Sequence, residues 1–195
     1  MFEPFPKLAR LKRGCVITEK IDGTNAQVLV RLAMDVEAYD PNYVIARDGD
    51  YLLFAGSRTR MLKPGKDTDN FGFAAWVYDN APELLKLGSG RWFGEWYGQG
   101  IQRGYGLTEK RFALFNTARP KETLPACVSQ VPVILKGSLN DADSCMAALK
   151  TVGSYAVPGF MSPEGIVIYH TASRTAYKQT FEHDELGKEA SLKAA

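Results

Sequence analysis

The residue best suited to chemistry is Lys20, which lies within the sequence Glu-Lys-Ile-Asp-Gly-Thr-Asn at positions 19–25. Alternation along the preceding apolar run places Lys20 on one face of a predicted strand and Glu19 on the other. A lysine facing the inside of a sheet loses hydration, which disfavours its ammonium form and yields an amine nucleophile. Gly23 lets the backbone turn sharply and approach a ligand closely. The segment therefore predicts a reactive amine at the end of a strand.

Strands joined by tight turns are expected to position this amine. Alternation and aromatic enrichment predict strands at 15–20, 26–32, 43–46, 51–55, 91–97, 111–117, 166–170 and 175–181. Thr68 or Asp69 is expected to cap a helix over 71–87 that is interrupted near Pro82. Ser138 with Asp141 resembles a capping box that opens a helix ending near residue 150. We therefore expect an α+β fold of antiparallel sheets flanked by a few helices.

Length and composition set the class of protein. The chain has 195 residues, of which 45% are hydrophobic and 24% are charged, so residues 1–195 are predicted to form a single domain. No apolar run approaches the roughly 20 residues that span a bilayer, and the N-terminus lacks the pattern of a signal peptide. We expect a soluble cytoplasmic protein with no membrane association. Three cysteines and two histidines show no zinc-ligand spacing.

Two basic clusters lie at 7–13 and 58–66, although the net charge is only +2. Each is equally consistent with a solvated face and with a surface that follows a phosphate backbone.

The common nucleotide-binding and hydrolytic motifs are absent. The glycines at 98, 100 and 104 miss the dinucleotide fingerprint by one residue, and the Gly65-Lys66 pair lacks the rest of a P-loop. No Gly-x-Ser-x-Gly sequence occurs, and two histidines leave little scope for a hydrolase triad.

Five blocks in order resemble the covalent nucleotidyltransferases, which comprise DNA ligases, RNA ligases and mRNA capping enzymes. Residues 19–23 resemble motif I, whose lysine attacks the α-phosphate of a nucleoside triphosphate. The later blocks are Ser57-Arg58, the motif III-like 93–98 with its companion strand 112–116, the motif IV-like 163–168 and the motif V-like 176–178. The resemblance runs from residue 19 to residue 178 and implies a ligase-type nucleotidyltransferase fold.

The resemblance also implies roles for individual residues. Lys20 would be the nucleophile, Lys178 would neutralise charge on the α-phosphate, and Glu164 would bind a divalent metal or help to deprotonate Lys20. Glu95 would bind the ribose and Phe115 would stack on the purine, although core packing is an equal alternative for Phe115. The other nucleotide-binding candidates are Glu19, Asp22, Asn25 and Arg58. ATP and Mg²⁺ are the implied cofactors, with Mn²⁺ as an alternative metal.

Three features distinguish this chain within the superfamily. At position 25 this chain has asparagine, as many RNA ligases do, whereas DNA ligases and capping enzymes tend to have arginine there. Ala176 stands where motif V presents the first lysine of a Lys-x-Lys pair, so Arg174 or another cation would have to substitute, or phosphate binding would be weaker. Only 17 residues follow Lys178, so we expect no OB-fold domain.

Asn25, the resemblance of residues 97–104 to the glycine-rich continuation seen in RNA ligases, and the expected lack of an OB-fold domain favour an ATP-dependent RNA ligase. Such an enzyme would form lysyl-AMP at Lys20, transfer AMP to a 5′-phosphate end and seal it to a 3′-hydroxyl. The expected partner is nucleic acid with such ends, RNA being favoured, together with an accessory protein if binding needs a further domain. A small DNA ligase, a guanylyltransferase and a nucleotide-binding module that does not ligate are the alternatives.

Overall fold

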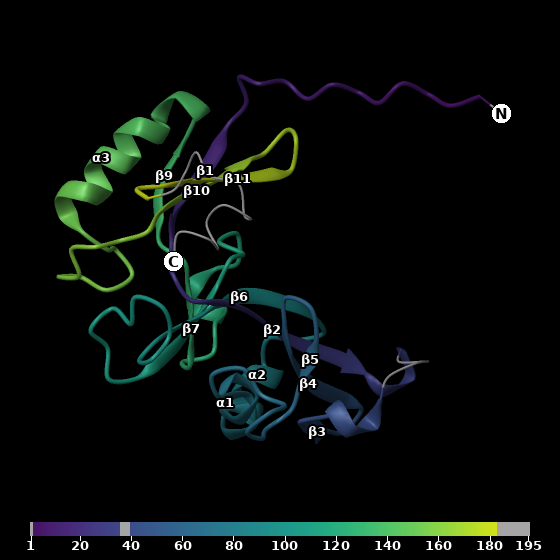
Figure 1. Cartoon of the computed structure of the whole chain (residues 1–195). Helices are drawn as coiled ribbons and strands as arrows, with labels where there is room; N and C mark the ends of the chain where they lie inside the picture. The colour runs from purple at the N-terminus through teal and green to yellow at the C-terminus, as the bar shows by residue number, and fades with distance from the viewer. Residues whose placement is uncertain (1, 36–39, 183–195) are drawn as a thin grey trace. The chain divides into compact units, whose positions relative to one another are not determined.

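The computed structural model describes residues 2–35 and 40–182, and its contacts divide the chain into two compact units (Figure 1). The first unit contains the chain up to Ile21 and from Pro132 onward, and the second is Asp22–Val131. The chain therefore leaves the first unit directly after Lys20 and Ile21 and returns to it at Pro132. Among the described residues, no helix is both long and apolar enough to cross a bilayer.

The first unit is a four-stranded antiparallel sheet with one helix on it. Its strand order is β11 (Thr175–Thr180), β10 (Gly165–His170), β1 (Cys15–Lys20) and β9 (Val133–Gly137). The helix α3 (Ala142–Val152) packs on one face of this sheet, and a 3₁₀ turn (Leu139–Asp141) leads into it (Figure 1). The core between them contains Ile17, Ile166 and Ile168 of the sheet and Met146 and Leu149 of the helix.

The second unit is a seven-stranded sheet with two short helices. Six strands follow the order β3 (Ala46–Asp48), β4 (Tyr51–Ser57), β2 (Thr24–Leu32), β6 (Gly90–Gly98), β7 (Lys110–Leu114) and β8 (Val128–Gln130). β5 (Met61–Leu62) pairs with β4. Three 3₁₀ turns cover Ala33–Asp35, Pro41–Tyr43 and Lys121–Thr123.

The helices of the second unit are α1 (Phe73–Asp79) and α2 (Ala81–Leu85). The Asp69 carboxylate accepts hydrogen bonds from the backbone N–H groups of Ala74 and Ala75, which satisfies the helix start. Pro82 occupies the first turn of α2, where its missing N–H costs nothing. The predicted interruption at Pro82 is confirmed. Asp69 caps the helix through its side chain, although Gly72 occupies the N-cap position and α1 begins at Phe73 instead of residue 71. Phe73 packs against Trp96 and Phe112, with ring centroids 5.4 and 5.2 Å apart, and so joins α1 to the sheet.

The α+β class is confirmed, and two details of the prediction are wrong. The sheets are not wholly antiparallel, because β7 and β8 run parallel and residues 115–127 form the long connection that a parallel pair requires. The predicted strand at 43–46 is instead a 3₁₀ turn followed by β3. Asp40 accepts the N–H of Asn42 at 2.9 Å, which starts this turn and delays the strand.

The sequence does not predict β5, β8 and β9. The first two contain two and three residues. β9 has only three consecutive apolar residues, Val133–Leu135, before Lys136 and Gly137, which is too short a run for periodicity to identify a strand. The capping box at Ser138 and Asp141 is present as predicted.

Candidate active site

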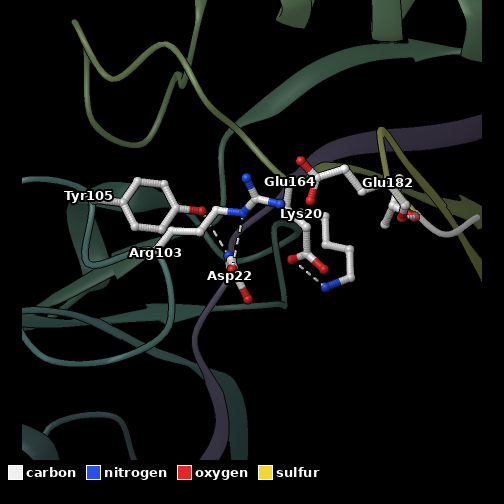
Figure 2. A network of polar contacts seen from close by, with 7 residues as sticks. Lys20, Asp22, Arg103, Tyr105, Glu164 and Glu182 are labelled. Carbon is white, nitrogen blue, oxygen red and sulfur yellow. Dashed lines mark hydrogen bonds and ion pairs between the residues drawn. The ribbon is translucent and has the colours of Figure 1, made fainter. Parts of the chain in front are cut away.

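Lys20 forms an ion pair with Glu164 in the first unit. The Lys20 Nζ lies 2.5 Å from Glu164 Oε2, and the two side chains are 24% and 19% exposed (Figure 2). Antiparallel pairing brings them together, because Lys20 lies opposite Gly165, the residue after Glu164. The arrangement holds a partly buried amine within proton-transfer distance of a carboxylate.

Lys178 lies on the same sheet face as Lys20. Thr18 pairs with Val167, and Val167 pairs with Lys178, so these three side chains point to one side of the sheet. Lys20 is two residues from Thr18 and shares that side. Val16, Lys136, Tyr169 and Ala176 form the next row on this Lys20 face. Lys136 is therefore a further cation on the Lys20 face, and it lies outside the sequence motifs.

Glu19 points to the opposite face and is 1% exposed. One carboxylate oxygen accepts the Ser154 hydroxyl at 2.6 Å and the other accepts the Ala156 N–H at 2.8 Å. Burial raises the pKa of the Glu19 carboxyl, and these hydrogen bonds act in the opposite direction. The Glu19 side chain thus connects the strand that carries Lys20 to the loop after α3. Its predicted contact with nucleotide remains a prediction.

In the second unit, Asp22 is held by two residues of the glycine-rich loop 98–106. Its carboxylate lies 3.1 Å from Arg103 Nε, and its backbone N–H donates to the Tyr105 hydroxyl at 2.7 Å (Figure 2). Tyr105 is 2% exposed and meets Tyr97 edge to face at 5.5 Å. Tyr105 and Gln102 adopt positive φ angles of 54° and 45°, so the loop keeps a strained shape. The Asp22 carboxylate is therefore already paired with Arg103, and its contact with nucleotide stays a prediction.

Gly23 is required by close packing. A Cβ at this position would lie 2.4 Å from the Trp96 carbonyl oxygen and 2.8 Å from Tyr97 Cβ. The turn after Asp22 therefore rests directly on the backbone of β6.

Asn25 and Glu95 are directly paired across β2 and β6, so their side chains lie on one face of the larger sheet. Phe93 is two residues before Glu95 and shares this face, and the N–H of Phe115 bonds to the Phe93 carbonyl at 3.0 Å. Phe93 and Phe115 are 44% and 41% exposed. Their exposure favours contact with a ligand over core packing for Phe115, and it identifies Phe93 as a second aromatic candidate.

The two arginines after β4 differ in their contacts. The Arg60 guanidinium donates to the carbonyl oxygens of Thr68 and Asp69 at 3.0 and 2.9 Å, so it fastens a loop. Among the described residues, Arg58 has no hydrogen-bond or ion-pair partner and is exposed. Arg58 is therefore the arginine available to a phosphate, as the motif predicts.

Most ligands of a divalent metal at this site would have to come from the substrate and from water. Within residues 2–35 and 40–182, no cluster of three histidine, cysteine or acidic side chains is placed to hold a metal. Glu164 supplies one carboxylate beside Lys20. A single carboxylate combined with substrate phosphates and water suits Mg²⁺, which usually retains several waters.

Arg103, Tyr105 and Ser154 also lie outside the five blocks that resemble the nucleotidyltransferases. The only sequence signal for the first two is the density of glycines at 98, 100, 104 and 106. Ser154 carries no local signal, because its partner Glu19 lies 135 residues away.

The sequence and the fold were compared with known proteins. The RNA ligase family model matches residues 13–193. No curated protein matches.

Solved structures of an RNA ligase from Naegleria gruberi are similar in fold. One with ATP and Mn has a TM-score of 0.59 at 17% identity and covers 94% of this chain and 51% of that chain. One with AMP and Mn has a TM-score of 0.56 at 18% identity and covers 95% and 52%. An apo structure has a TM-score of 0.58 at 18% identity and covers 94% and 52%.

The chain thus spans about half the length of these ligases, and at this identity the likeness is one of fold. The family model, in contrast, matches nearly the whole sequence. The chain therefore belongs to the RNA ligase family.

Proposed function

We propose that the chain is the catalytic part of an ATP-dependent RNA ligase, with a ligase-type nucleotidyltransferase fold in a single domain over residues 1–195. The observation that carries this proposal is the ion pair of Lys20 with Glu164, on the same sheet face as Lys178. Family membership and the Naegleria structures with ATP or AMP support the choice of nucleotide.

In the first step, the Lys20 amine attacks the α-phosphorus of ATP. The ammonium must first lose a proton, and the Glu164 carboxylate is an acceptor within reach. A nitrogen–phosphorus bond forms, the bond from the α-phosphorus to the bridging oxygen breaks, and pyrophosphate leaves with the electron pair. Lys178 neutralises the negative charge that develops on the α-phosphate.

In the second step, an oxygen of an RNA 5′-phosphate attacks the lysyl-AMP phosphorus, the nitrogen–phosphorus bond breaks, and Lys20 recovers its amine. In the third step, a 3′-hydroxyl attacks the activated 5′-phosphate and loses its proton. AMP leaves, and a phosphodiester bond remains.

The second unit supplies candidate contacts to the nucleotide. The Glu95 carboxylate accepts hydrogen bonds from the ribose hydroxyls, and Asn25 beside it contributes a neutral amide. Phe115, together with Phe93, offers an aromatic face to the purine. Arg58 binds a phosphate through its guanidinium. Glu19 and Asp22 act by holding motif I, since their carboxylates are engaged within the protein.

Mg²⁺ or Mn²⁺ would be held by Glu164 together with substrate phosphates, and it would neutralise phosphate charge when bound. Glu164 would then have to share its carboxylate between the metal and Lys20, because its Oε2 accepts from the Lys20 amine.

The decisive experiment is covalent labelling. The protein is incubated with α-labelled ATP and a divalent metal and then denatured, and retained label is counted. We expect acid-labile label on the wild type and on Lys150→Ala, a surface control, and none on Lys20→Ala. Absence of label on the wild type with both ATP and GTP, over a range of pH, would reject the covalent mechanism.

The same preparation distinguishes the alternatives. Label from GTP in place of ATP would indicate a guanylyltransferase. Sealing of DNA nicks in preference to ends with RNA termini would indicate a DNA ligase. Label retained with no sealing of any end would indicate a module that binds nucleotide without ligating.

A further inference from the structure

The segment before β1 exposes a large amount of apolar surface. Residues 2–14 form neither helix nor strand and extend from the start of β1 (Figure 1). Phe2, Phe5, Leu8 and Leu11 are 91%, 83%, 76% and 70% exposed. Such a series of exposed apolar side chains marks an interaction surface. We refer to residues 2–13 as the N-terminal arm.

The N-terminal arm has a sequence period of three. Its apolar side chains occur at positions 2, 5, 8 and 11, and basic side chains occur at positions 7, 10 and 13. An extended polyproline-type chain repeats every three residues, so in that conformation each set would line one side. Pro4 and Pro6 favour this conformation because they fix their φ angles near −65°. The arm thus combines an apolar stripe with a basic stripe.

The root of the arm is attached to the sheet that carries Lys20. The His170 ring accepts the Ser173 N–H at Nδ1 and must therefore donate from Nε2 to the Leu11 carbonyl at 2.9 Å. The Thr171 N–H and hydroxyl both donate to the Gly14 carbonyl, at 3.1 and 2.6 Å. β1 then runs five residue steps from Cys15 to Lys20, which is about 17 Å. The arm therefore starts a short distance from the proposed nucleophile.

We propose that the N-terminal arm binds single-stranded RNA close to the end that is joined. This inference rests on the proposed function for the class of nucleic acid. The arm contains four cations, at positions 7, 10, 12 and 13, and one acidic residue, Glu3. Its net positive charge is complementary to a phosphate backbone. Phe2 and Phe5 offer rings on which bases stack without sequence preference.

A membrane surface fits these observations less well. Peripheral segments of that kind bind as amphipathic helices, and Pro4 and Pro6 disfavour a helix here. The same prolines stiffen the arm, which lowers the entropy lost when it binds an extended strand. The family model begins at residue 13, so residues 2–12 of the arm lie before the matched region.

The test compares three double variants of the whole chain. Lys7→Gln/Arg10→Gln removes two cations of the arm, and Phe2→Ala/Phe5→Ala removes its rings. Lys121→Gln/Lys150→Gln removes two exposed cations elsewhere and serves as the matched control. Affinity for a 5′-phosphorylated single-stranded RNA of about 12 nucleotides is measured at several salt concentrations.

We expect the charge variant to reduce the slope of log K against log salt by about 1.4, that is about 0.7 for each lost phosphate contact. Loss of the rings should weaken binding at least about fivefold with little change in slope. The control should match the wild type. Unchanged affinity and slope in both arm variants would overturn the proposal, as would arm-dependent binding to anionic lipid vesicles without arm-dependent binding to RNA.

Lysyl-AMP formation by the wild type is measured in parallel. Label uptake combined with arm variants that bind RNA normally would reject the arm proposal alone. Absence of label uptake would reject the proposed function, and the salt slope would still report on the arm.

Discussion

At the scale of single residues, the proposed nucleophile, Lys20, directly contacts its proposed proton acceptor, Glu164. Lys20 Nζ donates to the Glu164 carboxylate at 2.5 Å, and the amine can attack only after a proton has left it. Transfer of the proton to Glu164, or competition for its carboxylate by a metal, would release the amine. The chemistry of the first step thus depends on Glu164 as much as on Lys20.

Glu164→Gln should therefore slow label uptake from α-labelled ATP. The amide has nearly the same shape but cannot accept the Lys20 proton as a carboxylate does, so we expect a loss of about 10²- to 10⁴-fold. Single-turnover labelling measures this rate, and Glu122→Gln on the surface is the control. Labelling by Glu164→Gln at the wild-type rate would exclude Glu164 as the proton acceptor.

Arg58 and Arg60 offer a second comparison at this scale. Arg58→Ala should weaken the use of nucleotide or of a 5′-phosphate about tenfold without changing Tm, because Arg58 has no partner among the described residues. Arg60→Ala should lower Tm by a few degrees, because two backbone carbonyl groups lose their donor. Thermal unfolding and labelling assays of both variants measure this contrast. Equal Tm losses in the two variants would contradict the assignment.

At the scale of elements, the approach of the motif I turn to β6 requires glycine. Gly23→Ala would bring its Cβ to 2.4 Å from the Trp96 carbonyl oxygen, so backbone must move. We expect the free energy of unfolding to fall by about 1–3 kcal/mol. Gly14→Ala is the matched control, because its Cβ would meet only the Gly137 carbonyl at 3.7 Å. Urea unfolding measures both, and equal stability of the two variants would contradict the packing argument.

Glu19 connects β1 to the loop after α3, and its titration should affect stability. Burial raises the pKa of this carboxyl above its ordinary value of 4.5, so the folded chain binds the proton more tightly than the unfolded chain does. The contribution to stability is therefore present below 4.5 and is lost as pH rises through the raised pKa. Glu19→Gln cannot titrate, so its stability should not show this loss.

The free energy of unfolding of the wild type, relative to that of Glu19→Gln, should therefore fall as the pH rises above 4.5. Urea unfolding over a series of pH values above and below 4.5 measures this difference. Parallel pH profiles would show that the pKa of Glu19 is the same in the folded and unfolded chains.

At the scale of the whole molecule, ligand binding should raise stability. In Lys20→Ala, which cannot form the covalent bond, ATP at one hundred times its Kd should add about 2.7 kcal/mol to the free energy of unfolding. For a chain of this length, that corresponds to a rise in Tm of about 5–10 °C. Thermal unfolding with ATP and with GTP measures the preference for the base. Equal shifts in Tm with the two nucleotides would contradict selectivity for adenine.

Much of the fold follows from local sequence. Alternation along 15–20 and 91–97 predicts β1 and β6, Asp69 and Pro82 predict the breaks around α1 and α2, and the capping box predicts the start of α3. These signals are local, because they arise from residues within a few positions of one another. The parallel pairing of β7 with β8 is not local, and the sequence does not predict it.

The site around Lys20 shows the same contrast between local and non-local determinants. The sequence by itself determined its place at the end of a strand, with Glu19 on the opposite face, and the order of the motifs that follow it. The resemblance implied that Glu164 binds a metal or acts on Lys20. Only the tertiary structure decided that Glu164, 144 positions away, forms an ion pair with Lys20, and that Tyr105 binds the backbone of Asp22, 83 positions before it. Side-chain direction follows from the local geometry of a strand. The choice of a distant partner depends on strand register and packing across the whole fold, which no short segment specifies.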